Sequence, residues 1–127
     1  MKSFTRNLVC FLLLAGFSAT SGAVEIIAHR GASYDAPENT MASVKLGWKQ
    51  KADGVEIDIW LTKDGKIILL HDENTKRTTG VDKKVHEQTF DELRRQDAGS
   101  WKDPKFKGEK LPTLDEVLKT VPKGKRL

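Results

Sequence analysis

Three short strings in this chain carry side chains that can do chemistry: His29-Arg30-Gly31, Glu56-Ile57-Asp58 and His71-Asp72. Histidine exchanges protons near neutral pH, so His29 and His71 are candidates for a general acid and a general base. The carboxylates of Glu56 and Asp58 are oxygen ligands of the kind that Ca²⁺ and Mg²⁺ take. The forked guanidinium of Arg30 suits a phosphate. This combination indicates metal-assisted hydrolysis of a phosphodiester.

Each string also has an ordinary interpretation when it is taken alone. Two carboxylates spaced by two on a strand are usually a solvated face, and a lone histidine at a strand end is more often structural. Arg30 can form an ion pair with Asp35 or Glu38, and His71-Asp72 can simply begin a turn. Three such strings at adjacent strand ends favour the functional interpretation over these separate ones.

The elements that must position these residues begin with a strand, a loop and a helix. The apolar, β-branched run Val24–His29 predicts a buried first strand that ends on the first histidine. Arg30–Pro37 contains Gly and Pro and predicts a loop. Asn39 or Thr40 can cap the helix that follows. That helix repeats three apolar residues on one face: Met41, Val44 and Trp48.

A second strand over Val55–Thr62 follows this helix, so the order strand–helix–strand predicts a parallel pair. Its residues alternate strictly: Val55, Ile57, Ile59 and Leu61 face one way, and Glu56, Asp58, Trp60 and Thr62 the other. In a parallel α/β barrel the aliphatic face meets the outer helices, while the polar face looks into the barrel, where a site can lie.

The next connection predicts an antiparallel hairpin. Lys63–Lys66 is only four residues long, whereas a parallel crossover needs about a dozen or more. Asp64-Gly65 is a strong signal for a two-residue type I′ turn. With that turn His71 lies directly opposite Asp58, and their Cβ atoms are about 4.5–5.5 Å apart. A shift of one residue would point His71 away from the carboxylates.

Two capping boxes predict short helices in the second part of the chain. Thr89 and Glu92 have the required spacing, and so do Thr113 and Glu116. Between the hairpin and the first box the sequence predicts mainly connecting segments. Lys125–Leu127, after the last helix, is typical of the approach to another strand.

The N-terminal segment has the pattern of an export signal. Lys2 and Arg6 precede an apolar run over Leu8–Ala15 that is too short to span a bilayer, and small residues follow at 21–23. We therefore expect a signal peptide over residues 1–23 and a secreted or periplasmic protein. A buried N-terminal helix is the alternative, but no amphipathic face supports it. Cys10 lies in this segment and is the only cysteine, so residues 24–127 form no disulfide.

Composition excludes several classes of partner. Removal of residues 1–23 takes away two basic residues and lowers the formal charge from +4 to +2. The lysines between Lys102 and Lys110 are accompanied by no groove-reading motif, so a solvated loop is favoured over nucleic-acid binding. No stable membrane span is expected outside the signal, and the sequence does not indicate an oligomeric state.

Three longer strings carry a resemblance: IIAHRGASYDAPENT, ADGVEIDIWLTKDGKIILLHDENTKRTTG and KLPTLDEVL. In this order and spacing the chain from residue 24 onward resembles the N-terminal part of the glycerophosphodiester phosphodiesterase family, within the PLC-like phosphodiesterase superfamily. The resemblance implies an α/β fold, a TIM-type (β/α)8 barrel, with the hairpin after its second strand. It also implies a divalent cation, Ca²⁺ or Mg²⁺, and hydrolysis of deacylated phospholipids to an alcohol and glycerol 3-phosphate.

The resemblance also implies roles for the five candidate residues. His29 and His71 resemble the acid–base pair, with His29 favoured as the base and His71 as the acid. Glu56 and Asp58 resemble metal ligands, and Arg30 resembles a contact to the substrate phosphate. The small-molecule glycerophosphodiester is the expected partner. The neighbouring PENT string is expected to shape its loop and cap the helix.

One departure from the family pattern concerns completeness. The family takes a further metal-binding glutamate from the next strand, which would begin near Arg126-Leu127. A typical barrel has about 250 residues. We therefore expect a truncated barrel over residues 24–127, with an incomplete cation site and marginal stability. Two other functions stay open: a relative that acts on intact lipid, as phospholipases do, and a noncatalytic module that binds phosphate or a cation.

Overall fold

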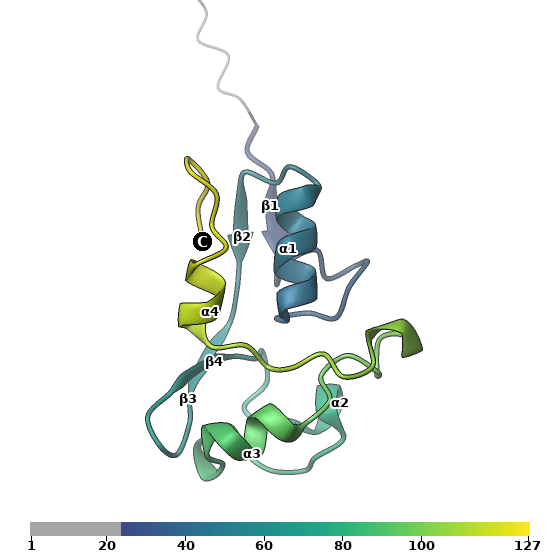
Figure 1. The fold of residues 1–127 in the computed structure, drawn as a ribbon, viewed down its shortest axis with the longest axis vertical. Helices are drawn as coiled ribbons and strands as arrows, with labels where there is room; N and C mark the ends of the chain where they lie inside the picture. Colours follow the sequence, from purple (N-terminus) through teal and green to yellow (C-terminus); the bar gives the residue numbers. More distant parts are fainter. Residues whose placement is uncertain (1–23) are drawn as a thin grey trace, which may run out of the picture.

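The computed structural model describes residues 24–127, so the predicted signal peptide lies outside the described residues. A strand–helix–strand unit lies beside a hairpin with short helices (Figure 1). The elements in chain order are β1 (Ile27–His29), α1 (Met41–Lys49), β2 (Gly54–Glu56), β3 (Ile59–Leu61), β4 (Ile67–Leu69), α2 (Lys76–Thr79), the 3₁₀ turn η1 (Val85–Glu87), α3 (Phe90–Arg95), the 3₁₀ turn η2 (Pro104–Phe106) and α4 (Leu114–Leu118).

The predicted parallel unit is confirmed. β1 and β2 pair in parallel, with His29 opposite Glu56, and α1 connects them. Thr40 is the cap of α1, because its hydroxyl accepts from the Ser43 amide while the Ser43 hydroxyl accepts from the Thr40 amide. These bonds satisfy amides that the first turn of a helix leaves without partners, and so fix where the helix begins.

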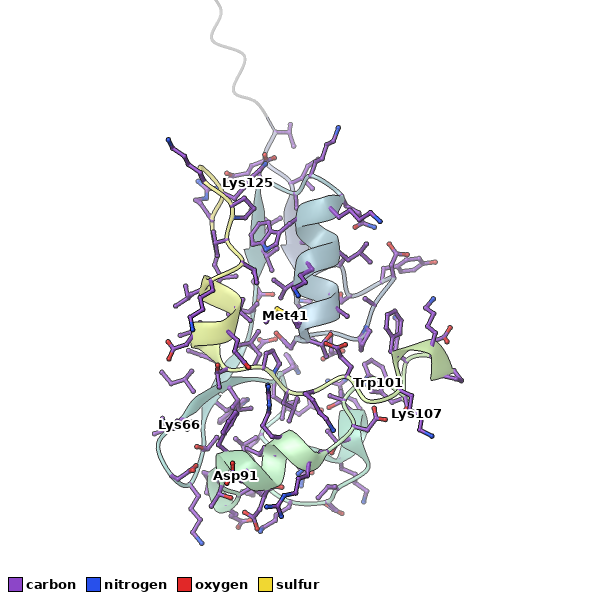
Figure 2. All side chains as sticks on the ribbon, viewed as in Figure 1. Met41, Lys66, Asp91, Trp101, Lys107 and Lys125 are labelled. Carbon is purple, nitrogen blue, oxygen red and sulfur yellow. The ribbon has the colours of Figure 1, made fainter. Side chains whose placement is uncertain are left out.

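One apolar face of α1 packs on the sheet, as predicted. Val44 is buried with Val55, and Met41 and Trp48 pack against the same group. Figure 2 places Met41 at the lower end of α1, next to the segment that leads to α4. Burial of this face is the main contribution that holds α1 in place, since a helix of nine residues is marginal by itself.

The segment at Arg126 pairs with β2 through an isolated parallel bridge, in line with the predicted approach to another strand. Arg126 forms a parallel bridge with Gly54, and the Val55 amide donates to the Arg126 carbonyl over 3.0 Å. β2 therefore lies between β1 and the segment at Arg126. This is the strand order of a sheet that continues in parallel beyond β2.

Two predictions about the strands are wrong. The first strand covers only Ile27–His29 instead of 24–29, and it is exposed rather than buried, since Ile27 is 46% exposed. The predicted single strand over 55–62 is interrupted after Glu56, and β3 pairs with β4 in a separate antiparallel sheet. Ile59 and Leu61 are exposed as a result, while Trp60 packs on the apolar cluster beside α3.

β4 joins two apolar clusters. Its alternate side chains point to opposite faces, so Leu69 packs with the α1 cluster while its neighbours on either side pack with the other. That other cluster contains Ile68, Leu70, Val85, Leu93, Ala98 and Leu111. β4 belongs to the hairpin but contributes side chains to both clusters, and this packing fixes the hairpin part relative to the strand–helix–strand unit.

Both predicted capping boxes are confirmed. In α3 the Thr89 hydroxyl accepts from the Glu92 amide and the Glu92 carboxylate accepts from the Thr89 amide, and Thr113 and Glu116 do the same in α4. The segment between the hairpin and α3, predicted as connecting, contains the short helix α2 and the turn η1. Within residues 24–127, no helix is long and apolar enough to cross a membrane.

Candidate active site

The ends of β1 and β2 bring the first histidine to the first carboxylate. His29 and Glu56 are the last residues of these strands and lie opposite each other in the parallel register. His29 Nε2 is 3.9 Å from Glu56 Oε2, and the Arg30 amide donates to that same oxygen over 3.0 Å. The side chains share a face because residues opposite each other in a sheet point the same way.

Arg30 turns into the site from a left-handed backbone conformation with φ of 55°. Its Nη1 donates to Glu38 Oε1 over 3.1 Å, and its Nε lies 3.4 Å from Asp58 Oδ2. The Nε is buried and makes no hydrogen bond, so its attraction to Asp58 is electrostatic without hydrogen-bond alignment. The guanidinium therefore joins the loop that begins at His29-Arg30-Gly31, the HRG loop, to the second carboxylate.

Two hydrogen bonds with the Asn39 side chain, called the clasp below, hold Asp58 where the predicted strand is interrupted. Asn39 Nδ2 donates to Asp58 Oδ2 over 2.9 Å, and the Asp58 amide donates to Asn39 Oδ1 over 3.1 Å. The amide of Asp58 thus bonds to a side chain in place of a strand neighbour. Asn39 is 1% exposed, so this pair of bonds is shielded from water.

His71 is connected to Arg30 through three charged residues. These residues, together with Glu56 and Asp58, are called the network below. Its Nδ1 is 2.7 Å from Asp72 Oδ1, and Arg77 Nε donates to Asp72 Oδ2 over 2.7 Å. Arg77 also donates twice to Glu38, over 3.0 Å and 2.8 Å. Because Glu38 accepts from Arg30 as well, the two histidine strings are joined through one carboxylate.

The predicted placement of His71 directly opposite Asp58 is wrong. Ile59 pairs with Leu69, so Leu70 is the residue opposite Asp58, and its amide donates to the Asp58 carbonyl over 3.1 Å. The turn is longer than the predicted two residues, because Thr62 and Lys66 pair around it and Gly65 has φ of +77°. A three-residue loop with Gly in the left-handed position gives this shifted register.

Arg77 lowers the pKa values of the two acids that it contacts. The hydrogen bond from Arg77 lowers the pKa of Asp72 to about 2 and lowers the pKa of Glu38 below its usual range. The same carboxylates raise the pKa of Arg77. Both acids are therefore carboxylates at neutral pH and accept hydrogen bonds only.

Two carboxylate oxygens of the cluster are left without hydrogen bonds in the described part of the chain. Hydrogen bonds within the described part of the chain use Glu56 Oε2 and Asp58 Oδ2, which leaves Glu56 Oε1 and Asp58 Oδ1 as acceptors. Four carboxylates face two arginines in the network, so it is net negative when the histidines are neutral. In residues 24–127 no group of three or more His, Cys, Asp or Glu is placed to hold a metal. The donors fit a hard cation as part of its ligand set.

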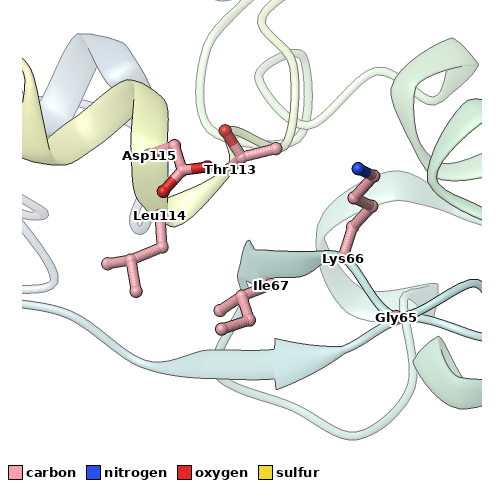
Figure 3. A pocket seen from close by; sticks show the side chains of 6 residues that line it. All are labelled: Gly65, Lys66, Ile67, Thr113, Leu114 and Asp115. Atoms are coloured by element: carbon pink, nitrogen blue, oxygen red, sulfur yellow. The ribbon is translucent and has the colours of Figure 1, made fainter.

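Hollows flank both strand ends. One of about 410 Å³ includes His29 and Gly31 in its lining, and another of about 330 Å³ includes Glu56 and Arg126. A smaller hollow of about 230 Å³ lies between β4 and the start of α4 (Figure 3). Its lining contains none of the five candidate residues, so this smaller hollow is separate from the candidate site.

The structure also assigns places to residues that the sequence did not single out. Arg77 is the clearest case, because nothing in its local string marks it as different from a solvated arginine. Its distance along the chain from Asp72 could have indicated its role. α2 begins four residues after Asp72 and is ended by Gly80, which has φ of 78°. A single helical turn there returns Arg77 toward the His71-Asp72 string.

Comparison with known sequences places the chain among related proteins. The model of the Glycerophosphoryl diester phosphodiesterase family matches residues 29–127. The protein YhdW of Bacillus subtilis (strain 168) is 52% identical over 94 residues, covering 74% of this chain and 39% of that relative. A glycerophosphodiester phosphodiesterase of Caldanaerobacter subterraneus subsp. tengcongensis is 45% identical over 96 residues, covering 76% of this chain and 40% of that relative. The chain spans about 40% of these curated relatives.

Solved structures give the same grouping. A phosphodiesterase from Oleispira antarctica in complex with the product sn-glycerol-3-phosphate has a TM-score of 0.73 and 43% identity, covering 76% of this chain and 39% of that one. A glycerophosphodiester phosphodiesterase from Agrobacterium tumefaciens str. C58 also has a TM-score of 0.73, with 41% identity, and covers 76% of this chain and 42% of that one. The fold of residues 24–127 is consistent with part of a TIM-type barrel.

Proposed function

Because this chain belongs to the glycerophosphoryl diester phosphodiesterase family, we propose that it supplies the N-terminal part of an enzyme that hydrolyses glycerophosphodiesters to an alcohol and glycerol 3-phosphate. The observation that carries the proposal is the meeting of His29 with Glu56 at paired strand ends, beside Arg30 and Asp58. A proton-transfer group, a phosphate contact and two cation ligands are the parts that this reaction needs.

In the proposed reaction His29 accepts the proton of the attacking hydroxyl as the new P–O bond forms. His71 donates a proton to the departing alkoxide as the P–O bond to the alcohol breaks. Arg30 orients the phosphate through its guanidinium, whose position is set by Glu38 and Asp58. His29 thus gains the proton that the nucleophile loses and His71 loses one to the departing alcohol, and proton exchange with solvent returns both rings to their starting states.

The proposed cofactor is Ca²⁺ or Mg²⁺, held in part by Glu56 and Asp58. When bound, such a cation stabilises negative charge on a nonbridging phosphate oxygen and acidifies a nearby hydroxyl. The free oxygens Glu56 Oε1 and Asp58 Oδ1 are the proposed ligand atoms. The remaining ligands of the cation are proposed to lie outside this pair.

The test uses a chimera that joins residues 24–127 to the remaining part of the Caldanaerobacter relative, of which this chain covers 40%. We expect it to release glycerol 3-phosphate from glycerophosphocholine, to lose activity with a chelator and to regain it with Ca²⁺ or Mg²⁺. His71→Ala should lower kcat by about 10²–10⁴-fold or more, the usual contribution of a general acid.

His86→Ala is the matched control, because His86 is an exposed histidine that pairs with Glu73 outside the network. It should leave the rate unchanged. Full activity in both Glu56→Ala and His71→Ala would show that this site is assigned to the wrong residues. Release of phosphorylated headgroup products only from intact lipid would instead favour the phospholipase-like function, and cation or phosphate binding without turnover would favour the noncatalytic module.

We also propose that residues 1–23 are a signal peptide, that residues 24–127 are a partial domain of this family and that the protein is secreted or periplasmic. The support is the basic, apolar and small-residue order of the N-terminal segment. Expression in a bacterium with a secretory pathway, followed by N-terminal sequencing of the exported product, tests this. The proposal expects a product that begins at Val24, and full-length product retained in the cytoplasm would contradict it.

A further inference from the structure

Arg77 makes two forked ion pairs with carboxylates from different segments. Its Nε and Nη2 donate to Asp72 over 2.7 Å and 3.1 Å. Its Nη1 and Nη2 donate to Glu38 over 3.0 Å and 2.8 Å. All three nitrogens of one guanidinium are therefore used, and two-pronged contacts of this kind fix orientation as well as charge.

The Asp72 side of this contact decides which nitrogen of His71 carries a proton. Asp72 is ionised at neutral pH, as an ordinary aspartate is, and the two hydrogen bonds from Arg77 fix the place of this carboxylate and lower its pKa further, to about 2. A carboxylate only accepts hydrogen bonds, so the 2.7 Å contact requires the proton on His71 Nδ1. Nε2 of the neutral ring is then the nitrogen without a proton. The backbone of His71 is held separately, because Trp60 Nε1 donates to the His71 carbonyl over 3.2 Å.

The Glu38 side reaches Arg30. Glu38 Oε1 accepts from both arginines, over 3.1 Å from Arg30 and 2.8 Å from Arg77. The Glu38 side chain is 11% exposed, whereas that of Arg77 is 42% exposed. A shift of Arg77 would leave a nearly buried carboxylate with one partner, at a cost in free energy that favours rearrangement of Arg30.

Arg77 itself is held by its surroundings. It lies in α2, which ends at Gly80 in the left-handed conformation, and the neighbouring Thr79 hydroxyl donates to Gln96 over 2.8 Å. The ring of Trp101 lies 5.8 Å from the guanidinium carbon and contributes a cation–π contact. The guanidinium is thus held both by the helix that carries it and by an aromatic ring.

We propose that Arg77 is a positioning residue that sets the proton on His71 through Asp72 and the direction of Arg30 through Glu38. It couples the two ends of the site without touching the reacting atoms. The roles of His71 and Arg30 rest on the proposed function, whereas the coupling itself rests on the contacts of Arg77. A lysine cannot replace it, because an ammonium lacks the planar fork that makes both pairs at once.

The first test measures the tautomer of His71 by ¹⁵N NMR in the full 127-residue chain and in the chimera. The proposal expects the neutral ring to carry its proton on Nδ1 in the parent, and to divide it between both nitrogens in Arg77→Gln and Arg77→Lys. The matched control is Arg94→Gln, which removes a forked pair of the same kind with Glu116, at 2.9 Å and 2.9 Å, outside the network. Retention of the Nδ1 form in both Arg77 variants would overturn the proposal.

The second test separates positioning from general stability by kinetics in the chimera. Arg77→Gln should lower kcat by about 10²-fold, the effect of a misplacement of about 1 Å at a reacting group. Its effect should be smaller when Asp72 is already Asn, because the branch to His71 is then already lost and only the contact of Arg77 with Glu38 is left to remove. An equal loss in Arg94→Gln, or full additivity with Asp72→Asn, would overturn the proposal.

The two readouts also separate this proposal from the proposed function. If the parent chimera is inactive, the assignment of the reaction fails, yet the tautomer of His71 still reports on Arg77. If Arg77→Gln does not fold, the charge-conserving Arg77→Lys and the Asp72→Asn variant supply the same measurement. An active parent with unchanged His71 tautomer in those variants contradicts the role of Arg77 alone.

Discussion

Replacement of Gly31 by alanine should destabilise the protein for two reasons, the left-handed backbone at this position and the lack of space for a methyl group. Gly31 has φ of +76°, and an added Cβ would lie 2.5 Å from Ser43 Oγ and 2.6 Å from the Ser43 carbonyl carbon. The left-handed conformation costs an alanine about 1–2 kcal/mol. Forcing a methyl group against fixed backbone costs about 1–3 kcal/mol more. We therefore expect Gly31→Ala to lower the free energy of unfolding by about 2–5 kcal/mol.

Gly65→Ala is the control that separates these two costs. Gly65 has nearly the same φ, +77°, but nothing lies within 4 Å of its added Cβ. It should therefore lose only the conformational part, about 1–2 kcal/mol. The difference between the two variants measures how closely α1 approaches the HRG loop.

The crowding at Gly31 also has a consequence for the site. The Ser43 hydroxyl donates to the Arg30 carbonyl over 3.0 Å, so displacement of Ser43 moves the backbone that carries Arg30. We expect Gly31→Ala to raise KM for glycerophosphocholine in the chimera, and Gly65→Ala to leave it unchanged. Urea unfolding and steady-state kinetics give both quantities. Equal destabilisation by the two variants, or an unchanged KM in Gly31→Ala, would refute this reasoning.

Three further predictions concern the core, the pH response and the cation. Ile68→Ala, at a fully buried position, should cost about 2–5 kcal/mol in urea unfolding, whereas Ile59→Ala, at an exposed one, should cost much less. Because the folded pKa of Asp72 lies below its ordinary value of 3.8, its contribution is present above about pH 4 and is lost as the pH falls toward 2. The free energy of unfolding should therefore fall less in Asp72→Asn than in the parent when the pH is lowered from about 5 to 2. Glu56→Gln should raise the Ca²⁺ concentration needed for half-maximal activity in the chimera, and an unchanged titration would remove Glu56 from the ligand set.

Local rules predicted the parts of the fold that depend on neighbours in sequence. The capping boxes at Thr89 and Thr113 specify where α3 and α4 begin, since both partners lie within one turn. The parallel unit follows from the alternation of a strand, a helix and a strand, and its register places His29 opposite Glu56. The capping boxes need only residues within one turn and the parallel pairing needs only the order of the elements, whereas the register of His29 opposite Glu56 was not predicted.

The features that sequence reasoning missed depend on distant contacts or on turn type. The strand is interrupted beside Asp58 because Asn39, nineteen residues earlier, takes the place of a strand neighbour. The hairpin register differs because Asp64-Gly65 fits a two-residue turn and also the end of a three-residue one, and the choice moves every pair. The place of Arg77 depends on where α2 puts it relative to Glu38.

The clasp between Asn39 and Asp58 restricts which sequences this site can adopt during evolution. Asn39 has φ of 53°, is almost fully buried, and both donates to and accepts from Asp58. Aspartate at position 39 would lack the donor, and alanine would lack both groups and disfavour the left-handed backbone. Asparagine is thus tied to this position for as long as Asp58 is retained. Across relatives, positions 39 and 58 should vary together or stay fixed together, which marks the pair as one inherited unit of the site.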